Sequence, residues 1–292
     1  MRKIEIPSTE NLGHGHLACA GCGAAIGMRL TLKALGEKIV MVFPASCWSI
    51  IPGHWPYSSF KISSLHAGFV TGGATASGVR AALDIRGDRE SLVAVWAGDG
   101  ATFDIGLQAL SGAAERNEDI LYICNDNEGY MNTGTQRSSA TPYLAWTTTT
   151  PVQQPKENPK KDIMAIMADH QIPYAATTTI AYPEDFLRKM EKAKKMRGTR
   201  FIHLLSPCSP GWKIPSELTI KISRLAVRSR VFPLYEIENG RSYTIQEEPR
   251  VVSVKEYLKL QGRFSHLTEQ NIEEIQRRVD DSWERLLKRA RC

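Results

Sequence analysis

What this sequence most clearly lacks is a long apolar run. Its apolar stretches, such as residues 39–43 and 92–97, are far shorter than the roughly 18 residues that a membrane-spanning helix requires. The first residues also lack the apolar segment of a secretory signal. We therefore expect a cytoplasmic protein with no membrane partner, whose cysteines are reduced thiols.

Charge is sparse and only mildly unbalanced. Charged residues make up 23% of the 292 residues, and 37 Lys and Arg stand against 31 Asp and Glu, a net charge of +6. Near the C-terminus the basic residues are interleaved with Asp280, Asp281 and Glu284, while apolar residues recur at helical spacing. This pattern predicts the solvent face of an amphipathic helix. Because no known nucleic-acid-binding module accompanies the charge, we expect no nucleic-acid partner.

Internal repeats and low-complexity tracts are absent as well; what is present is an alternation of short apolar runs with helical patterns. The runs, each predicted to be a buried parallel strand, are residues 39–43, 92–97, 120–124, 174–178 and 201–205. The helical patterns are residues 24–35, 68–86, 104–116, 162–170 and 184–196. This alternation predicts an α/β fold, a parallel sheet with helices on both faces.

The pattern changes after residue 206. Before that point, residues 147–159 form a polar loop with several prolines, and the alternation of apolar runs and helical patterns continues after this loop. From residue 207 on, the sequence predicts helices over 218–228, 256–261 and 272–288, and a hairpin that turns at Asn239-Gly240 between residues 234–237 and 242–245. We therefore expect an α/β domain over residues 1–206 and a C-terminal extension over residues 207–292, which packs on that domain or on a partner.

Polar or sulfur-bearing residues follow four of the predicted strands. These residues are Ser46 and Cys47 after the first run, Gly98-Asp99-Gly100 after the second, Asn125-Asp126-Asn127 after the third and Cys208 after the last. Open parallel sheets bind their ligands beyond the carboxyl ends of the strands. We therefore expect these residues to meet at one edge of the sheet.

Asp99 and Asn127 offer hard oxygen ligands, a carboxylate and an amide, of the kind that Mg²⁺ prefers. Gly98 and Gly100 allow backbone amides to approach a diphosphate, and the helix predicted to begin near Asp104 would turn its positive end toward it. Gly-Asp-Gly alone is a common turn. Paired with an Asn-rich turn after the next strand, it resembles the motif that binds thiamine diphosphate and Mg²⁺.

Four of the six cysteines lie in loops, namely Cys19, Cys22, Cys47 and Cys208. Four sulfur ligands suit either Zn²⁺ or an iron–sulfur cluster. Structural zinc usually takes its ligands as two local pairs, but Cys47 and Cys208 are solitary and far apart in the sequence. The fold itself would therefore have to assemble the site. The alternative is an incidental Cys-X-X-Cys with two ordinary core thiols, although loops give a buried thiol little reason to be there.

The chain resembles the β subunit of pyruvate:ferredoxin oxidoreductase, one of the 2-oxoacid:ferredoxin oxidoreductases, over nearly its whole length. The residues that carry the resemblance are His16-Leu17-Ala18-Cys19-Ala20-Gly21-Cys22-Gly23, Gly98-Asp99-Gly100, the segment 104–112, the segment 126–134 and Trp283-Glu284-Arg285-Leu286-Leu287. Several specific motifs in the family's order make coincidence an unattractive explanation.

The resemblance implies three cofactors. Cys19, Cys22, Cys47 and Cys208 would bind one 4Fe-4S cluster. Asp99, Asn127 and the backbone carbonyl of Gly129 would hold Mg²⁺. Thiamine diphosphate would lie against a set of residues that also includes Gly98 and Gly100, namely Ser46, Cys47, Ala101, Asn132 and Thr133.

In such enzymes a small 2-oxoacid loses CO₂, and its electrons pass through the cluster to a ferredoxin-like subunit or a soluble ferredoxin. The chain contains only one sheet pattern, which corresponds to the diphosphate-binding half of a thiamine site. We therefore expect a separate subunit to supply the pyrimidine-binding domain. No residue of this chain is assigned a catalytic role beyond positioning the cofactors.

The sequence departs from the family's pyruvate-using members at two places. They often have Cys-Leu-Glu where this chain has Cys47-Trp48-Ser49, and Phe-Glu-Asn where it has Phe69-Val70-Thr71. Losing two carboxylates would favour a substrate more negatively charged than pyruvate, with oxalate as the leading hypothesis; neutral drift is the alternative.

Two other functions remain open at this stage. One is a non-redox thiamine-dependent decarboxylase or lyase subunit, with zinc-bound or idle thiols. The other is a zinc-stapled scaffold without catalysis. His66 and Arg137 lie near the predicted site, but their residue types alone assign neither of them a role.

Overall fold

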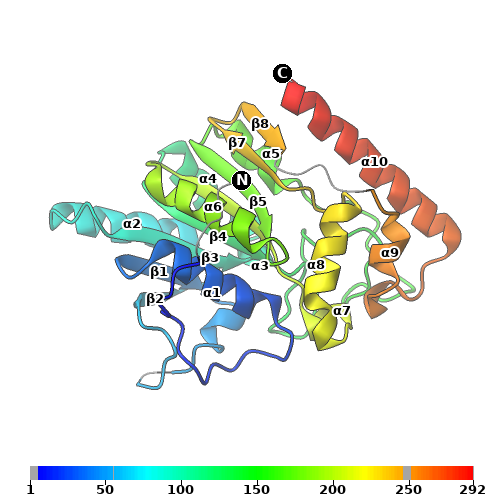
Figure 1. Cartoon of the computed structure of the whole chain (residues 1–292), viewed down its shortest axis with the longest axis horizontal. Helices are drawn as coiled ribbons and strands as arrows, with labels where there is room; N and C mark the ends of the chain where they lie inside the picture. The colour runs from blue at the N-terminus through cyan, green and yellow to red at the C-terminus, as the bar shows by residue number, and fades with distance from the viewer. Residues whose placement is uncertain (1–5, 55, 246–250, 292) are drawn as a thin grey trace.

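A single mixed sheet organises the molecule (Figure 1). The computed structural model describes residues 6–54, 56–245 and 251–291, so the first five residues, on which part of the secretion argument rests, lie outside it. Within these ranges eight strands form the order β2-β1-β3-β4-β6-β5-β7-β8. The strands are β1 Ile39–Pro44, β2 Ser63–Ala67, β3 Leu92–Gly98, β4 Leu121–Asp126, β5 Tyr174–Thr179, β6 Arg200–Leu205, β7 Tyr235–Glu238 and β8 Ser242–Ile245.

The five predicted strands are confirmed as β1, β3, β4, β5 and β6, and neighbouring strands among them pair in parallel. The strand β2 was not predicted. It pairs in parallel with β1 at the edge of the sheet and carries mostly exposed side chains. An edge strand without a buried face needs no apolar run, so its sequence, Ser-Ser-Leu-His-Ala, gives no strand signal.

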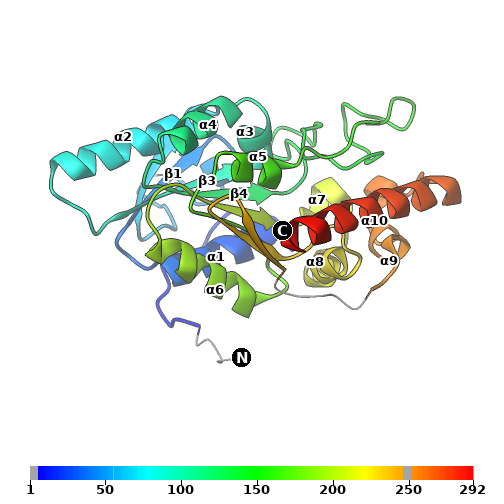
Figure 2. The same cartoon turned by 90° about the horizontal axis from the view of Figure 1, so that it is seen from above.

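Helices cover both faces of the sheet, as predicted (Figure 2). The helices α1 Gly23–Leu35 and α6 Pro183–Lys195 pack on one face, over a core that includes Met28, Trp96 and Met190. The other face is covered by α2 Gly72–Ile85, α4 Leu107–Glu115 and α5 Ile163–Asp169. The α/β fold expected from the alternation of runs and helices is therefore confirmed.

The helix predicted over residues 104–116 is confirmed as α4, which begins three residues later, at Leu107, and ends at Glu115. A short helix, α3 Asp99–Phe103, follows β3 directly, and the backbone leaves helical geometry at Asp104 before α4 begins at Leu107. A Cβ atom on Gly106 would lie 1.9 Å from the carbonyl oxygen of Ala101, so this turn requires glycine. The helix N-terminus expected near Asp104 lies three residues further on, at Leu107, and a second helix that was not predicted begins at Asp99.

The C-terminal segment joins the same sheet and then covers one end of it. The predicted hairpin is β7 and β8, and β7 pairs antiparallel with β5. The remaining helices of the described chain are α7 Ser209–Trp212, α8 Thr219–Arg228, α9 Val254–Leu258 and α10 Glu269–Arg291, with 3-10 turns at Cys47–Ser49, Ser216–Leu218 and Gly262–Phe264. The helix predicted over residues 256–261 begins two residues earlier. The side chains of Trp283 and Leu286 anchor α10 on the core beside α5.

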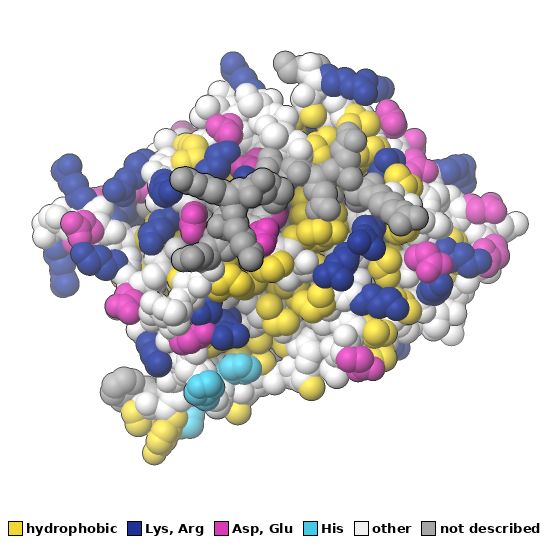
Figure 3. Space-filling model, in the orientation of Figure 1, with side chains coloured by type: hydrophobic (Ala, Val, Ile, Leu, Met, Phe, Trp, Pro, Cys, Tyr) yellow, Lys and Arg dark blue, Asp and Glu magenta, His cyan; other side chains and the backbone are white. Residues whose placement is uncertain are grey.

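Basic and acidic side chains are mixed on the surface. On the face shown in Figure 3, Lys and Arg are interspersed with Asp and Glu rather than gathered into one field. The amphipathic C-terminal helix predicted over 272–288 is α10, whose Arg277 and Arg278 pair with Glu274 of the same helix. Across the described residues, no helix combines the length and the apolar character needed to cross a membrane.

The glycine-rich start of α2 allows close helix packing, and this can be measured. A Cβ atom on Gly73 would lie 2.6 Å from the carbonyl oxygen of Ala109 in α4, whereas one on Gly78 in the same helix would meet nothing within 4 Å. We expect Gly73→Ala to lower the free energy of unfolding by about 1–3 kcal/mol, because the backbones must move apart. Gly78→Ala should leave it unchanged or raise it by up to about 1 kcal/mol. Urea unfolding compares the two variants, and equal effects would contradict the packing argument.

Candidate functional site

The loops that follow β1, β3, β4 and β6 lie side by side, because these strands are neighbours in the sheet. Beyond β1, β3 and β4 lies a cavity of about 240 Å³. The predicted residues that line it are Ser46, Cys47, Gly98, Asp99, Gly100, Asn127, Gly129, Asn132 and Thr133. Ala101 does not line it and lies buried within α3. The structure therefore brings together all but one of the predicted cofactor-contacting positions.

The Asn127 side-chain amide lies against two oxygen acceptors in this cavity. One end of the amide lies 2.9 Å from the carbonyl oxygen of Gly129 and 3.0 Å from Asp99 Oδ1. The hydrogen-bonding partners place the amide nitrogen at this end, as a donor to both oxygens. In the opposite orientation the amide oxygen would face two other oxygens, and a bound cation would be needed to stabilise it. Three groups that can supply oxygen ligands to a cation therefore meet here.

A left-handed turn at Glu128 brings the Asn127 amide and the Gly129 carbonyl together. Glu128 lies between Asn127 and Gly129 and has a φ of 66°, which is uncommon for a residue other than glycine. Thr141 Oγ1 donates to the carbonyl oxygen of Glu128 at 2.9 Å and holds the turn. As a result the Asn127 side chain and the Gly129 carbonyl point to the same place. Strained backbone of this kind often marks a ligand-binding loop.

Asp99 is almost completely buried, at 1% exposure, and Ser138 Oγ donates to its Oδ2 at 2.5 Å. Burial, together with the negative charge of Asp126, raises the pKa of Asp99 well above its usual value. Within the described chain no Lys or Arg pairs with Asp99. A cation bound at the three oxygens would stabilise its ionised form.

The loop between Asp126 and Glu128 is held by a buried ionic network. Lys160 Nζ lies 2.5 Å from Asp126 Oδ2 and 2.9 Å from Glu128 Oε1, so it links the carboxylates on either side of Asn127. His203 Nε2 also contacts Asp126 Oδ2 at 2.7 Å. Burial alone would raise the pKa of Asp126, but Lys160 and His203 lower it to about 2.

The C-terminal extension supports the same loop from the other side. Trp212 Nε1 donates to the backbone carbonyl of Asn127 at 2.7 Å, and Arg263 Nη2 donates to Glu128 Oε2 at 2.6 Å. The guanidinium of Arg263 stacks on the Trp212 ring, 3.9 Å from its centroid. Residues from two distant parts of the chain therefore fix the position of Asn127.

The four predicted cysteine ligands line a second, smaller cavity of about 120 Å³. Cys19 is exposed at its mouth, while Cys22, Cys47 and Cys208 are half-buried. Cys47, Asn127 and Asn132 line both cavities, so the thiols lie next to the oxygen site. The structure thus brings all four cysteines to one place, although Cys208 lies far from the others in the sequence.

Backbone contacts hold the Cys19–Cys22 loop against the segment around Cys208. Gly23 N donates to the carbonyl oxygen of Pro207 at 3.1 Å, and a Cβ atom on Gly23 would lie 2.9 Å from that oxygen. Ser209 Oγ donates to the carbonyl oxygen of Ala20 at 2.6 Å, and Thr219 Oγ1 donates to that of Gly21 at 2.6 Å. These contacts explain how the fold, rather than a local knuckle, assembles the thiols.

Without a bound metal the inner thiols are neutral. Burial raises the pKa of Cys47 to about 11 and that of Cys208 to about 12, and the neighbouring thiols contribute in the same direction. The five described cysteines form no disulfide. Within the described ranges, no three His, Cys, Asp or Glu side chains converge closely enough to hold a single metal ion.

Several lining residues were not predicted. The apolar wall of the larger cavity comes from Trp48, Phe69, Tyr130 and Met131, all of which lie in or beside quoted motifs. The sequence did not identify Lys160 as a site residue, because a lysine that directly follows the polar segment 147–159 resembles an ordinary surface residue. His66 is exposed on β2, and Arg137 is exposed as well; neither lines either cavity.

Known proteins similar to this chain support one family. Residues 48–204 match the family model "Thiamine pyrophosphate enzyme, C-terminal TPP binding domain". The ketoisovalerate oxidoreductase subunit VorB of Pyrococcus abyssi is 50% identical over 99% of this chain and 96% of its own length. The pyruvate synthase subunit PorB of Methanocaldococcus jannaschii is 47% identical over 95% of this chain and 97% of its own length. The chain belongs to the β subunits of the 2-oxoacid:ferredoxin oxidoreductases.

A solved structure agrees with this β subunit in fold. The 2-oxoglutarate:ferredoxin oxidoreductase from Magnetococcus marinus matches with a TM-score of 0.60 at 22% identity, over 77% of this chain and 81% of that chain. The resemblance stated from the sequence motifs is therefore confirmed at the level of the family.

The role of Lys160 in this β subunit can be tested by substitution. We expect Lys160→Met to lower the free energy of unfolding by about 3 kcal/mol, because it leaves two buried carboxylates without their shared counter-ion. The matched control is Lys221→Met, which changes an exposed lysine on α8 and should cost less than about 0.5 kcal/mol. Urea unfolding measures both, and a Lys160 variant as stable as its control would contradict the importance of the network.

Proposed function

We propose that this chain holds thiamine diphosphate, Mg²⁺ and one 4Fe-4S cluster in an enzyme that oxidatively decarboxylates an aliphatic 2-oxoacid and passes the electrons to ferredoxin. The observation that carries the proposal is the shared wall of the two cavities. Cys47, Asn127 and Asn132 border both the oxygen site and the thiols. A cofactor in one cavity would therefore lie beside a redox centre in the other.

The oxygen site fits Mg²⁺ in its geometry. Octahedral Mg²⁺ binds oxygen at 2.0–2.1 Å, which places neighbouring ligand oxygens about 2.9 Å apart. One end of the Asn127 amide lies 2.9 Å from the Gly129 carbonyl oxygen and 3.0 Å from Asp99 Oδ1. With the amide oxygen turned to this end, Asp99, Asn127 and Gly129 would supply three ligands and leave further positions for phosphate oxygens and water. This donor set supports a diphosphate-bound magnesium ion.

The thiol site suits a cluster better than a zinc ion. A tetrahedral zinc ion, with bonds of about 2.3 Å, draws its four sulfur atoms to within about 4 Å of one another. The described cysteines do not converge on a single-ion position, yet all four surround one cavity of about 120 Å³. A polynuclear cluster spreads its thiolate ligands over such a volume. The geometry therefore favours iron–sulfur binding over the zinc scaffold and over idle thiols.

The chain's own residues position and shield the cofactors. When bound, thiamine diphosphate supplies the electron sink for decarboxylation, and the cluster accepts electrons. Gly100 lets Tyr130 pack directly over α3, since a Cβ atom at Gly100 would lie 2.2 Å from the Tyr130 ring. Tyr130 Oη in turn donates to Asp104 Oδ2 at 2.7 Å. This packing closes one side of the cavity against water.

The lining of the larger cavity favours an aliphatic substrate. Trp48, Phe69 and Met131 form an apolar wall, and among the described residues no Lys or Arg lines this cavity. A dianion such as oxalate gains no charge partner from this chain, so the oxalate hypothesis finds no support in the lining. The names of the similar proteins, ketoisovalerate oxidoreductase and pyruvate synthase, refer to aliphatic 2-oxoacids. We therefore propose pyruvate or a branched-chain homologue as the substrate.

The cavity is incomplete on one side, which supports a partner subunit. Asn132 and Thr133 line it but remain exposed. Within the described chain one sheet provides only a diphosphate-binding half, so we propose that another subunit supplies the pyrimidine-binding domain. We further propose that a ferredoxin-like subunit or a soluble ferredoxin takes the electrons. The free thiols are consistent with work in the reducing cytoplasm.

The two cavities should lose their cofactors independently. The assembled enzyme, purified without oxygen, should contain about four iron atoms and four acid-labile sulfides per copy of this chain. If other subunits carry clusters of their own, these four atoms of each kind add to the iron and sulfide of those clusters. Cys208→Ala should remove most of this increment, whereas Cys124→Ala, which changes a buried thiol outside the cavity, should keep it. Asp99→Ala should keep the iron but lose Mg²⁺-dependent binding of thiamine diphosphate. Zinc in place of iron and sulfide would overturn the redox proposal.

The choice of substrate is tested by viologen reduction. We expect the assembled enzyme to use 2-ketoisovalerate or pyruvate with a kcat/KM at least about 10-fold above that for oxalate, because the apolar wall favours an aliphatic group. Asp99→Ala serves as the inactive control. Oxalate turnover that matches or exceeds both aliphatic acids would contradict the proposed substrate class and restore the oxalate hypothesis.

A further inference from the structure

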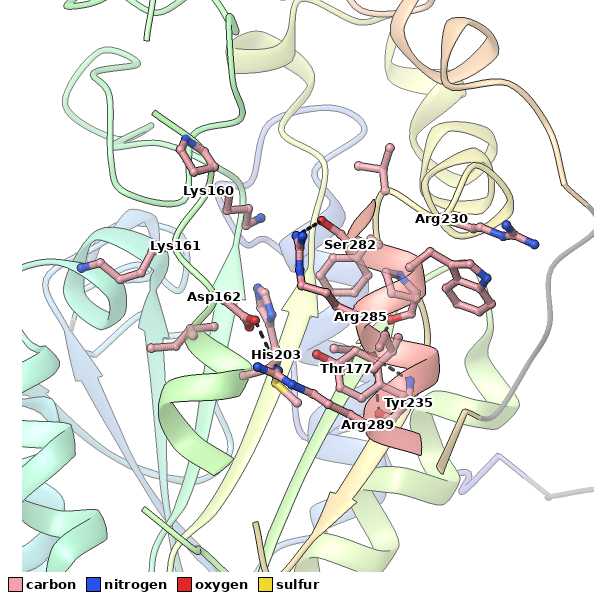
Figure 4. A pocket seen from close by; sticks show the side chains of 18 residues that line it. Lys160, Lys161, Asp162, Thr177, His203, Arg230, Tyr235, Ser282, Arg285 and Arg289 are labelled. Atoms are coloured by element: carbon pink, nitrogen blue, oxygen red, sulfur yellow. Dashed lines mark hydrogen bonds and ion pairs between the residues drawn. The ribbon is translucent and has the colours of Figure 1, made fainter. Parts of the chain in front are cut away.

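A separate cavity of about 580 Å³ lies between α10, the start of α5 and the strands β5, β6 and β7 (Figure 4). It shares no lining residue with the cofactor cavity or with the thiol cavity. Its volume lies in the range of about 300–1,000 Å³ that is typical of small-molecule sites. Nothing in the proposed reaction uses it.

The charges around this cavity are strongly one-sided. The cationic residues that line it are Lys160, Lys161, Arg230, Arg285 and Arg289, and the only carboxylate among its described lining residues is Asp162. Lys160 and Lys161 already have partners, since Lys160 pairs with Asp126 and Glu128 and Lys161 donates to the Phe103 carbonyl. The three arginines are therefore the groups available to a ligand.

Among the described residues, Arg289 alone of the three arginines forms an ion pair with a carboxylate. Arg230 Nε is buried and, among the described residues, has no hydrogen-bond partner. Arg285 Nη2 donates to the neutral Ser282 Oγ at 2.8 Å. Arg289 Nη1 forms a long ion pair with Asp162 Oδ2, at 3.7 Å (Figure 4). The other oxygen of Asp162, Oδ1, caps α5 by accepting from Ala165 N at 3.0 Å.

The rest of the wall is aromatic and apolar. Phe232, Tyr235 and Trp283 line the cavity, and the Arg230 guanidinium lies 4.6 Å from the centroid of the Trp283 ring. Planar guanidinium groups suit the oxygens of phosphate, and aromatic faces suit a flat organic group. The arrangement therefore matches an anion that carries an apolar or aromatic body.

We propose that this cavity binds a small phosphorylated organic anion of nucleotide size. Arg285 and Arg289 contact its phosphate from α10, and the aromatic wall, in which Arg230 stacks on Trp283, packs on its organic part. The site is distinct from the proposed cofactor cavity, so the two proposals can fail separately.

The test uses ADP and inorganic phosphate as probes, with binding to the assembled enzyme measured by calorimetry. We expect ADP to bind at least about 10-fold more tightly than inorganic phosphate, because only ADP reaches the aromatic wall. Higher salt should weaken ADP binding, since the contacts are ionic. Absence of ADP binding up to about millimolar concentration, or ADP binding no tighter than phosphate, would overturn the proposal.

A matched pair of double variants on α10 locates the binding. Arg285→Gln/Arg289→Gln removes two charges from the cavity and should weaken ADP binding at least about 10-fold. Arg277→Gln/Arg291→Gln removes two charges from the same helix outside the cavity and should leave ADP binding unchanged. Both variants should keep the 2-oxoacid-dependent reduction of viologen. Equal weakening in the two double variants would show nonspecific attraction and would overturn the assignment.

Discussion

The site depends on the contact between Asp99, Asn127 and Gly129. Asp99 begins α3 directly after β3, Asn127 and Gly129 follow β4, and one end of the Asn127 amide lies 2.9 Å from the Gly129 carbonyl oxygen and 3.0 Å from Asp99 Oδ1. The amide nitrogen satisfies both acceptors by donating to them, and with the amide turned over its oxygen would join them as a ligand of one cation. The surrounding structure holds the arrangement in place, through the ionic network at Asp126 and Glu128 and through Ser138 on the carboxylate.

The same constraint explains why the C-terminal extension is part of the site rather than an appendage. It provides Cys208 to the thiol cavity, Trp212 to the carbonyl of Asn127 and Arg263 to Glu128. Its hairpin also extends the sheet next to β5. One segment therefore fixes both the position of the oxygen site and the position of the thiols. The residues that line both cavities keep them adjacent, as electron transfer between bound cofactors would require.

Much of this could be predicted from the sequence, because buried parallel strands are apolar runs and their carboxyl ends face one edge. For that reason the strand pattern alone predicts that Cys47, Asp99, Asn127 and Cys208 meet. The strand β2 was missed because an exposed edge carries no apolar signal. The short helix α3 was missed because tertiary contacts decide where it ends, since Asp104 accepts hydrogen bonds from the distant Tyr130 and Ser139.

Buried charges were the least predictable feature. In the sequence, Lys160 and Arg263 look like ordinary surface residues, and only the fold reveals that each pairs with a buried carboxylate. Lys160 also lines the cationic cavity behind the site, so it borders both the loop that carries Asn127 and the proposed anion site. Its charge is already paired with Asp126 and Glu128, so Lys160 forms part of the wall of the anion site while the arginines face the ligand. A lysine that looks like a surface residue in the sequence thus lies between the two sites.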